Sequence, residues 1–365
     1  MHSPRAEGTP RLALDWLATE GHVQGVAFLS PEPADLLEEF RRTGCWLRVG
    51  DTLRPGPSKF LAIARFAGQC SSEFNPELVV AWPLGLSHWI FLGVRSRLSP
   101  AALISHGGNP PGAGWFSHYV MAWACFWTTG LCRGRVIACS KYVQRLFQEI
   151  PLVPKSVVGI SYNSVRAASI AERSGKARLA RAQGAPFRAV MVATLEAHKD
   201  HATLVRAAAL LRARGTALEI MIVGSGSLAE SLKALSRSVG AESMVTFLGT
   251  RNDIPELLGQ SDVFVLSTTP QEGRPGVILE ALAAGLPIIA SDVEPVREVL
   301  EDGKWGTLVP AGNPGALAAA LASAVESRDG DQIQIKNRQA HAAQFTPNQM
   351  IFNYLAEAGI HPGIV

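Results

Sequence analysis

The sequence predicts an α/β protein with two successive parallel sheets, and three observations lead to this fold class. Short apolar runs, each bounded by glycine, proline or polar residues, are typical of strands buried on both faces. Helix-forming stretches separate these runs, as the crossovers between parallel strands require. The runs fall into two groups on either side of a charged, alanine-rich stretch at residues 167–186. We therefore expect two Rossmann-like domains.

The first group of apolar runs predicts the strands of an amino-terminal domain at residues 1–166. These runs lie at residues 23–29, 78–82, 102–105 and 136–139. The second group predicts a carboxyl-terminal domain at residues 187–345, after a helix-bearing linker at 167–186. Its runs lie at residues 189–193, 218–223, 263–266 and 287–290. Residues 346–365 are expected to form a helix that packs back on the first domain.

Composition excludes several classes of protein. A chain of 365 residues with 47% hydrophobic content can bury two ordinary domains, and a net charge of +3 argues against a nucleic-acid partner. The five cysteines form no C-x-x-C pair, which indicates free thiols in a reducing compartment. Residues 1–10 carry no apolar signal-peptide core. We expect a cytoplasmic protein.

The segment after the run at 263–266 predicts a strand, a loop and a helix. Thr268 to Gly276 is too rich in threonine, proline and glycine to continue the strand. Pro275 suits the first turn of a helix over residues 277–284, and Gly285 suits its end. Ligands of open parallel sheets bind at the carboxyl ends of strands, so this loop is expected to border a ligand crevice.

Two glutamates, separated by seven residues, flank that expected crevice. A carboxylate such as Glu272 or Glu280 has only acceptor sites and can take two hydrogen bonds from a vicinal diol, as in ribose and hexose rings. The pair therefore indicates a nucleotide-sugar site. The alternative is that Glu280 only complements a helix dipole and Glu272 is a solvated loop residue.

The carboxyl-terminal half resembles the retaining GT-B glycosyltransferases of family 4. Its Glu-x7-Glu motif is that family's signature, and residues 187–325 follow the family's order of segments. The other matching segments are residues 223–228, 245–249, 253–255, 261–263, 289–292, 298–299 and 306–310. The resemblance implies two Rossmann-like domains facing across a cleft. It also implies transfer of a hexose-type sugar from a nucleotide-sugar to a glycan or lipid-linked acceptor, with retention and without a metal or cofactor.

The resemblance also assigns site residues. Glu272, Lys199 and His106 are the expected catalytic residues. Lys199 matches the lysine that binds the donor pyrophosphate, where an ammonium stabilises the leaving group's charge; the alternative is a solvated surface lysine. His106 is similar to the histidine that contacts the sugar near the reacting carbon. There it would orient and polarise the reacting groups rather than act as the sole base. Donor binding is assigned to Glu280, Gly224, Gly226, Gly273, Arg274, Pro275, Gly276 and Val277, and the acceptor side to Gly8 and Thr9.

Two departures from the family pattern stand out. The family has a strand and a loop before its first helix, whereas residues 1–6 are too short for both. We therefore expect a first domain without its first strand. The family's arginine a few residues before Lys199 is replaced by residues 192–195, which hold no cation. Arg274 is a candidate to supply the missing positive charge. The alternative is that Arg274 is an exposed arginine.

The segment at residues 116–133 is aromatic, apolar and basic at its end. It is too short for a spanning helix, which needs about 20 apolar residues. We expect a buried helix, and the alternative is a peripheral contact with the inner membrane face that would suit a lipid-linked acceptor. Residues 329–331 superficially match an Asp-x-Asp metal motif and are expected to be a turn.

Two other functions are compatible with these residues. A non-catalytic relative would bind a nucleotide-sugar without turnover, and a sugar-nucleotide epimerase would alter the free nucleotide-sugar. Product analysis separates both from a transferase.

Overall fold

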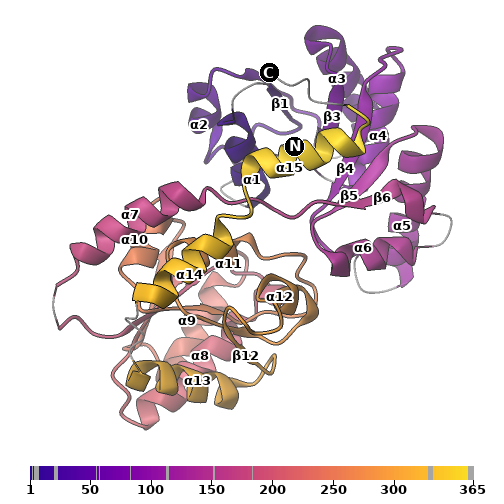
Figure 1. Ribbon diagram of the computed structural model, residues 1–365. Coiled ribbons are helices and arrows are strands. Elements are labelled where there is room, and N and C mark those ends of the chain that lie inside the picture. The colour runs from indigo at the N-terminus through magenta and orange to yellow at the C-terminus, as the bar shows by residue number, and fades with distance from the viewer. Residues whose placement is uncertain are drawn as a thin grey trace. The chain divides into compact units, whose positions relative to one another are not determined.

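The computed structural model describes residues 1, 3, 8–19, 24–54, 56, 58–82, 84–111, 115–150, 153–182, 184–327 and 332–360. The chain divides into two compact units (Figure 1). The first unit comprises Met1–Ser164 together with Pro347–Val365, and the second comprises Val165–Thr346.

In the first unit, the described strands form two separate parallel sheets. One sheet pairs β1 (Gly25–Phe28) with β2 (Trp46–Val49). The other has the order β3 (Leu78–Ala81), β4 (Ala102–Gly107), β5 (Arg135–Ala138) and β6 (Val158–Ile160). The helical elements are α1 (Gly8–Leu17), α2 (Leu37–Arg42), α3 (Lys59–Phe74), α4 (Leu84–Arg95), α5 (Trp115–Phe126), η1 (Trp127–Leu131), α6 (Lys141–Gln148), η2 (Lys155–Val157) and α15 (Pro347–Glu357).

The second unit contains one parallel sheet with the strand order β12-β11-β10-β7-β8-β9. Its strands are β7 (Arg188–Val192), β8 (Glu219–Val223), β9 (Val245–Gly249), β10 (Val263–Leu266), β11 (Ile288–Ser291) and β12 (Thr307–Val309). The helical elements are α7 (Ala167–Leu179), η3 (Ala197–Lys199), α8 (His201–Ala213), α9 (Ala229–Ser238), α10 (Ile254–Gly259), α11 (Gly276–Ala283), α12 (Glu294–Val299), α13 (Pro314–Ser327) and α14 (Gln332–Ala342).

Burial explains why the central strands read as continuous apolar runs. Every residue of β10 and β11 is buried, because helices cover both faces of the sheet. β10 lies between β11 and β7, at the point where the strand order reverses direction along the chain. In open sheets of this kind, the loops that follow such strands border the ligand site.

The structure places the unit boundary two residues before the expected one and changes the assignment of the linker. Helix α7, which lies in residues 167–186, packs against α10, and its Arg173 donates two hydrogen bonds to Glu256, at 2.8 and 2.7 Å. The segment that follows α7 is also attached to the sheet. Residues 167–186 are therefore part of the second unit, because α7 buries apolar side chains such as Ile170 there.

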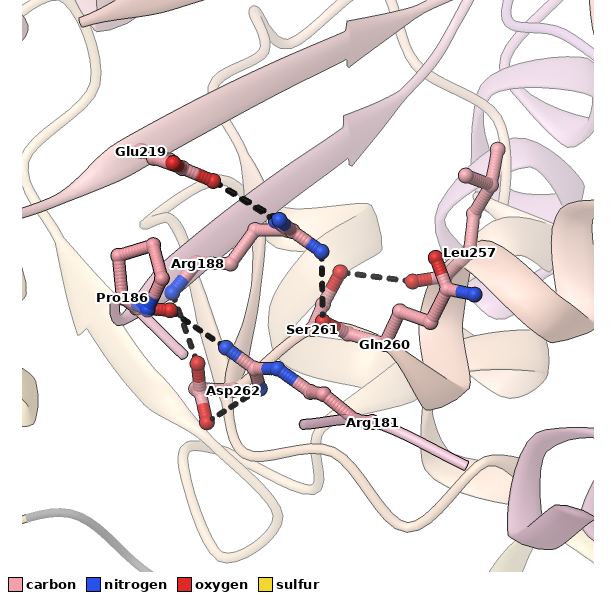
Figure 2. A network of polar contacts seen from close by, with 8 residues as sticks. All are labelled: Arg181, Pro186, Arg188, Glu219, Leu257, Gln260, Ser261 and Asp262. Carbon is pink, nitrogen blue, oxygen red and sulfur yellow. Dashed lines mark hydrogen bonds and ion pairs between the residues drawn. The ribbon is translucent and has the colours of Figure 1, made fainter. Parts of the chain in front are cut away.

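Asp262, just before β10, anchors the entry to β7 (Figure 2). Its carboxylate accepts hydrogen bonds from the Arg181 side chain and from the Arg188 backbone N–H, both at 2.8 Å. Arg188 in turn forms an ion pair with Glu219 at the start of β8. This network joins the segment after α7 to the sheet.

Helix α15 lies in the first unit, although it follows the second unit in the chain. Its Tyr354 is fully buried, beside Met350. Arg135 of β5 donates to the Glu357 carboxylate at 2.6 and 3.0 Å, which fixes the end of the helix. The preceding helix α14 stays with the second unit.

Before α1, the described residues are Met1 and Ser3, and they form no strand. Met1 nevertheless bonds to the segment of β1. Its nitrogen donates to the Ala27 carbonyl at 2.6 Å, and the Leu29 N–H donates to the Met1 carbonyl at 2.9 Å. β1 has no further strand partner on this side among the described residues.

We predict that replacing Gly93 by alanine would force α3 and α4 apart. A Cβ there would lie 2.0 Å from the backbone oxygen of Ala64, and backbone cannot swing away as a flexible side chain can. Gly93→Ala should therefore destabilise the first unit by at least about 1–3 kcal/mol, measured by urea unfolding. The matched control is Gly85→Ala on the same helix, where a Cβ meets no atom within 4 Å. That variant should be neutral or stabilised by up to about 1 kcal/mol. Equal effects of the two variants would contradict the close helix contact.

Candidate functional site

The loop between β10 and α11 is buried. Glu272 is 5% exposed, and the three residues that follow it are also buried. Pro275 directly precedes α11, whose first turn is formed by Gly276 and Val277. This burial contradicts the alternative that Glu272 is a solvated loop carboxylate.

Lys199 and Glu272 form a salt bridge, although 73 residues separate them in the chain. Both side chains are largely withdrawn from solvent, with 15% and 7% of their areas exposed. Backbone contacts hold the two loops together, because Thr269 N–H donates to the His198 carbonyl at 2.9 Å. The Thr268 hydroxyl donates to the same carbonyl at 3.0 Å. The lysine is therefore not a solvated surface residue.

Arg274 is buried as well, with 5% of its area exposed. Its guanidinium carbon lies 4.6 Å from the centre of the Phe345 ring, which is a cation–π contact within the second unit. The alternative of an exposed arginine is wrong. Burial is possible because the flat guanidinium stacks on an aromatic face.

The glycine loop after β8 packs against the loop after β7. Gly224 has φ of +139°, and a Cβ there would lie 2.0 Å from the Ala193 carbonyl oxygen. A Cβ at Gly226 would lie 2.6 Å from the Leu195 carbonyl oxygen. Both glycines are therefore needed for the close approach of two backbones.

Sequence reasoning missed Glu196, which ties these two loops together. Its carboxylate accepts hydrogen bonds from the Ser227 N–H at 2.9 Å and from the Ser227 hydroxyl at 2.7 Å. A glutamate a few residues before Lys199 carries no motif of its own. Only the packing of the loops after β7 and β8 identifies its partner.

Most of the expected donor residues lie at one edge of the second sheet. The loops that hold Lys199, Gly224 and Glu272 follow β7, β8 and β10, which are neighbours in the sheet. Parallel strands place their carboxyl ends at the same edge, so the three loops meet there. Glu280 lies on α11 and is partly exposed. This edge brings a cation, a buried carboxylate and backbone N–H groups of a helix start into one region.

His106 belongs to the first unit, near the carboxyl end of β4. It is 3% exposed, and its Nδ1 lies 2.5 Å from the hydroxyl oxygen of Tyr354 on α15. Burial lowers the pKa of His106 to about 4, so the imidazole is neutral at pH 7. Tyr354 is a second residue that sequence reasoning missed. Gly8 and Thr9 lie at the start of α1.

His201, two residues after Lys199, is a buried histidine that no motif singled out. It is 1% exposed, and neither ring nitrogen has a hydrogen-bond partner. Burial, followed by the charges of Lys199 and His198, lowers the pKa of His201 to about 4. The ring is therefore neutral at pH 7.

The aromatic segment at residues 116–133 forms α5 and the π-helical turn η1. The described part is buried on one side only. Cys125 and Thr128 are buried, whereas Trp123, Phe126 and Leu131 are 47%, 46% and 60% exposed. The expectation of a buried helix therefore holds for one face of the segment.

The described residues contain neither a membrane-spanning helix nor a cluster of metal ligands. No helix in this part of the chain is long and apolar enough to span a bilayer. No cluster of three or more histidine, cysteine, aspartate or glutamate side chains there could hold a metal ion. Residues 329–331, expected to form a turn, lie outside the described residues.

Comparisons with known sequences match the second unit most densely. Residues 179–341 match the family model described as Glycosyl transferases group 1. A putative glycosyltransferase EpsD of Bacillus subtilis is 36% identical over 132 residues, which are 36% of this chain and 34% of that protein. This alignment thus spans about a third of the curated relative. A putative colanic acid biosynthesis glycosyltransferase WcaL of Salmonella typhimurium is 24% identical over 349 residues, 93% of this chain and 83% of that protein.

Solved structures match over the whole chain. Anabaena Alr3699/HepE in complex with UDP-glucose has a TM-score of 0.80 at 20% identity, covering 98% of this chain and 97% of that one. WaaG, a glycosyltransferase involved in lipopolysaccharide biosynthesis, has a TM-score of 0.68 at 16% identity, covering 100% and 99%. The chain therefore has the GT-B fold, with two Rossmann-like domains.

We predict that protonation of His201 destabilises the second unit in acid. Its folded pKa of about 4 lies below the ordinary value of about 6.5, so the unfolded chain binds more protons between these values. Stability is therefore lost as the pH falls through this window, by about 2 kcal/mol between pH 7 and pH 5 for this residue. His201→Leu should lose about 2 kcal/mol less than the parent over the same interval in urea unfolding. Equal losses in the two proteins would contradict a neutral His201.

Proposed function

We propose that this chain is a retaining glycosyltransferase of family 4 that acts without a metal ion or cofactor. It transfers a hexose-type sugar from a nucleotide-sugar to a glycan or lipid-linked acceptor in the cytoplasm. The observation that carries the proposal is the buried Lys199–Glu272 pair. It lies at the carboxyl end of a parallel sheet, within the residues that match the group 1 glycosyl transferase model.

The second unit supplies the groups that a nucleotide-sugar needs. Lys199 offers a cation to the diphosphate, and the start of α11 offers N–H groups to the same charge. Glu280 offers carboxylate oxygens to the ribose hydroxyls. The solved structures of a similar fold include one in complex with UDP-glucose, which supports a nucleotide-sugar as the donor class.

In the proposed reaction the bond between the sugar carbon and the diphosphate oxygen breaks, and a bond to the acceptor oxygen forms on the same face. The leaving phosphate takes the acceptor proton. Lys199 stabilises the charge that grows on the diphosphate. Glu272 holds the Lys199 ammonium in place and accepts a hydrogen bond from the sugar.

His106 acts in this proposal as a neutral group that orients the sugar. A histidine with a pKa of about 4 carries no charge at pH 7, so it polarises a hydroxyl without adding a cation. The nearby Tyr354 hydroxyl fixes the ring through Nδ1. The other ring nitrogen, Nε2, is the atom that contacts the substrate in this proposal.

An acceptor linked to a lipid is supported by the exposed apolar side chains of α5 and η1. Val120, Trp123, Phe126 and Leu131 are each close to half exposed or more. Tryptophan and phenylalanine on such a face favour the headgroup region of a bilayer, where one side of the ring stays wet. We propose a peripheral contact with the inner membrane face at this segment.

A non-catalytic nucleotide-sugar binder is the second candidate. The observation that favours it is that residues 192–195 hold no cation; the residue that follows them, Glu196, is an acid and pairs with Ser227. Incubation with a panel of nucleotide-sugars and a crude lipid-linked acceptor pool separates the two. A transferase releases nucleoside diphosphate and labels the acceptor, whereas a binder shows only a raised Tm.

We predict that the second unit alone binds the donor nucleotide. Lys199, Glu272, Glu280 and the glycine loop all lie between residues 165 and 346, which form one unit with its own core. A fragment of these residues should bind a nucleoside diphosphate in calorimetry, and Lys199→Met should weaken this binding at least tenfold. If a folded fragment, checked by circular dichroism, gave no binding heat at millimolar ligand, the site assignment would be wrong.

We predict different kinetic effects for the two glutamates. Glu272→Gln should lower kcat by about a hundredfold, because its charge positions Lys199 against the leaving group. Glu280→Gln should mainly raise KM for the donor, by about tenfold, because ribose contacts do not change during the reaction. Glu230→Gln on the surface of α9 is the matched control and should leave both parameters unchanged. Small and equal effects at Glu272 and Glu280 would favour a structural role for both.

A further inference from the structure

In the second unit, helix α14 packs against α11 (Figure 1). Just after the end of α11, Gly285 has φ of +79°, and a Cβ there would lie 2.6 Å from Cγ2 of Ile335 in α14. The Arg338 side chain of α14 donates to the Gly285 carbonyl at 3.2 Å. Just before the start of α11, Arg274 lies on the ring of Phe345, three residues beyond α14. Helix α14 and the segment after it thus contact the chain on both sides of α11.

Phe345 is fixed through its backbone and through its ring. Its carbonyl accepts a hydrogen bond from the Val165 N–H at 2.8 Å. Its ring meets the His341 ring nearly at a right angle, with centroids 5.4 Å apart and planes at 81°. His341 in turn stacks on Trp305, with centroids 4.4 Å apart and planes at 15°. The aromatic face that Phe345 offers to Arg274 therefore has a defined position.

His341 supports this ring without adding a charge. It is buried, and burial lowers its pKa below the ordinary value, whereas the charge of Glu301 acts in the opposite direction. The imidazole is therefore neutral at pH 7. The charged groups around it are Lys304, Arg274 and Glu301, whose Oε1 lies 3.6 Å from Nδ1. A neutral ring places no second cation beside the Arg274 guanidinium.

Arg274 is suited to anchor the loop that carries Glu272. A single residue, Gly273, separates the two, and glycine has more backbone freedom than any other residue. On the other side of Glu272, the Thr269 N–H is bonded to the loop after β7. A fixed Arg274 limits the freedom of Gly273. It therefore helps to hold the Glu272 carboxylate where it meets Lys199.

The burial of Arg274 argues against direct contact with the donor. With 5% of its area exposed and its guanidinium carbon 4.6 Å from the ring centre of Phe345, this cation has little surface left for a diphosphate. A guanidinium that left the ring for a phosphate would lose the cation–π contact that compensates for its burial.

We propose that Phe345 is a positioning residue for the glycosyl transfer reaction. Its ring holds Arg274, and Arg274 holds the loop so that the Glu272 carboxylate keeps its place beside Lys199. Arg274 then acts on the shape of the loop and not on the donor diphosphate. The inference rests on the proposed function, because it gives Glu272 a role in turnover.

Four variants of the full chain test this role. Phe345→Leu keeps an apolar side chain but removes the aromatic face, whereas Phe345→Tyr keeps the face. Arg274→Met removes the cation, and the fourth variant combines Phe345→Leu with Arg274→Met. The matched control for lost packing is Phe187→Leu, a buried position at the amino end of β7 and thus at the opposite edge of the sheet from the site.

Three measurements are made on each variant. Release of nucleoside diphosphate from a panel of UDP- and GDP-sugars gives kcat and the donor KM. Calorimetry gives the affinity for UDP and for GDP. Circular dichroism gives Tm and shows that each variant is folded.

Phe345→Leu and Arg274→Met should each lower kcat at least about tenfold and change the donor KM less than about threefold, because the loop acts in turnover. The combined variant should lose no more than either single variant, since both changes break the same contact. Phe345→Tyr should keep kcat within about twofold of the parent. Phe187→Leu should also keep kcat, although its Tm falls.

Three results would overturn the proposal. One is an unchanged kcat in Phe345→Leu, and another is losses that multiply in the combined variant. The third is a loss of UDP or GDP affinity of about tenfold in Arg274→Met, because that arginine would then contact the diphosphate. Phe345→Trp is made in addition, since it keeps an aromatic face without a hydroxyl. Equal losses of kcat in the Leu, Tyr and Trp variants would also overturn the proposal.

Hydrogen exchange separates this inference from the proposed function. The amides of residues 268–276 should exchange at least about tenfold faster in Phe345→Leu than in the parent, whereas those of residues 224–228 should keep their rates. A parent chain with this exchange pattern but without turnover would contradict the proposed function and still support the hold of Phe345 on the loop. Unchanged exchange at residues 268–276 would overturn the role of Phe345.

Discussion

The salt bridge between Lys199 and Glu272 is the interaction on which the arrangement of the candidate site depends. It joins the loop after β7 to the loop after β10, and backbone bonds from Thr269 to His198 support it. Neither charge is well solvated, so removing one partner would leave the other without compensation, at a cost of about 3–5 kcal/mol for a fully buried pair. The pair therefore fixes the position of the Lys199 ammonium at this edge of the sheet. A lysine side chain without such a partner would lose more rotamer entropy when it binds a ligand.

The loop that carries Lys199 is also supported by close backbone packing against the loop after β8. Gly224 and Gly226 let the loop after β8 lie directly against residues 193–195, and Glu196 then holds Ser227 by two hydrogen bonds. A side chain at either glycine would push the two loops apart. The glycine loop thus has a structural role in shaping the sheet edge, whether or not its N–H groups also contact phosphate.

The first unit is organised by segments that arrive from distant parts of the chain. Helix α15 follows the second unit in sequence, yet its Tyr354 lies beside His106 and its Glu357 pairs with Arg135. The position of His106 therefore depends on the carboxyl-terminal helix. In the same unit, β1 and β3 flank a cavity of about 160 Å³.

The sequence by itself determined the α/β class, the alternation of strands and helices, and the loop that carries Glu272. Those features follow from local periodicity and from the turn residues, which act over a few positions. The assignment of Lys199 to the same region also came from the sequence, through a resemblance. Only the tertiary structure decided that Lys199 contacts Glu272, that Arg274 is buried against Phe345, and that α7 belongs to the second unit. Tyr354 and His106 are separated by 248 residues, and their contact depends on how complete sheets and helices pack. No short pattern in the chain encodes such a contact, because burial and pairing are set by the whole core.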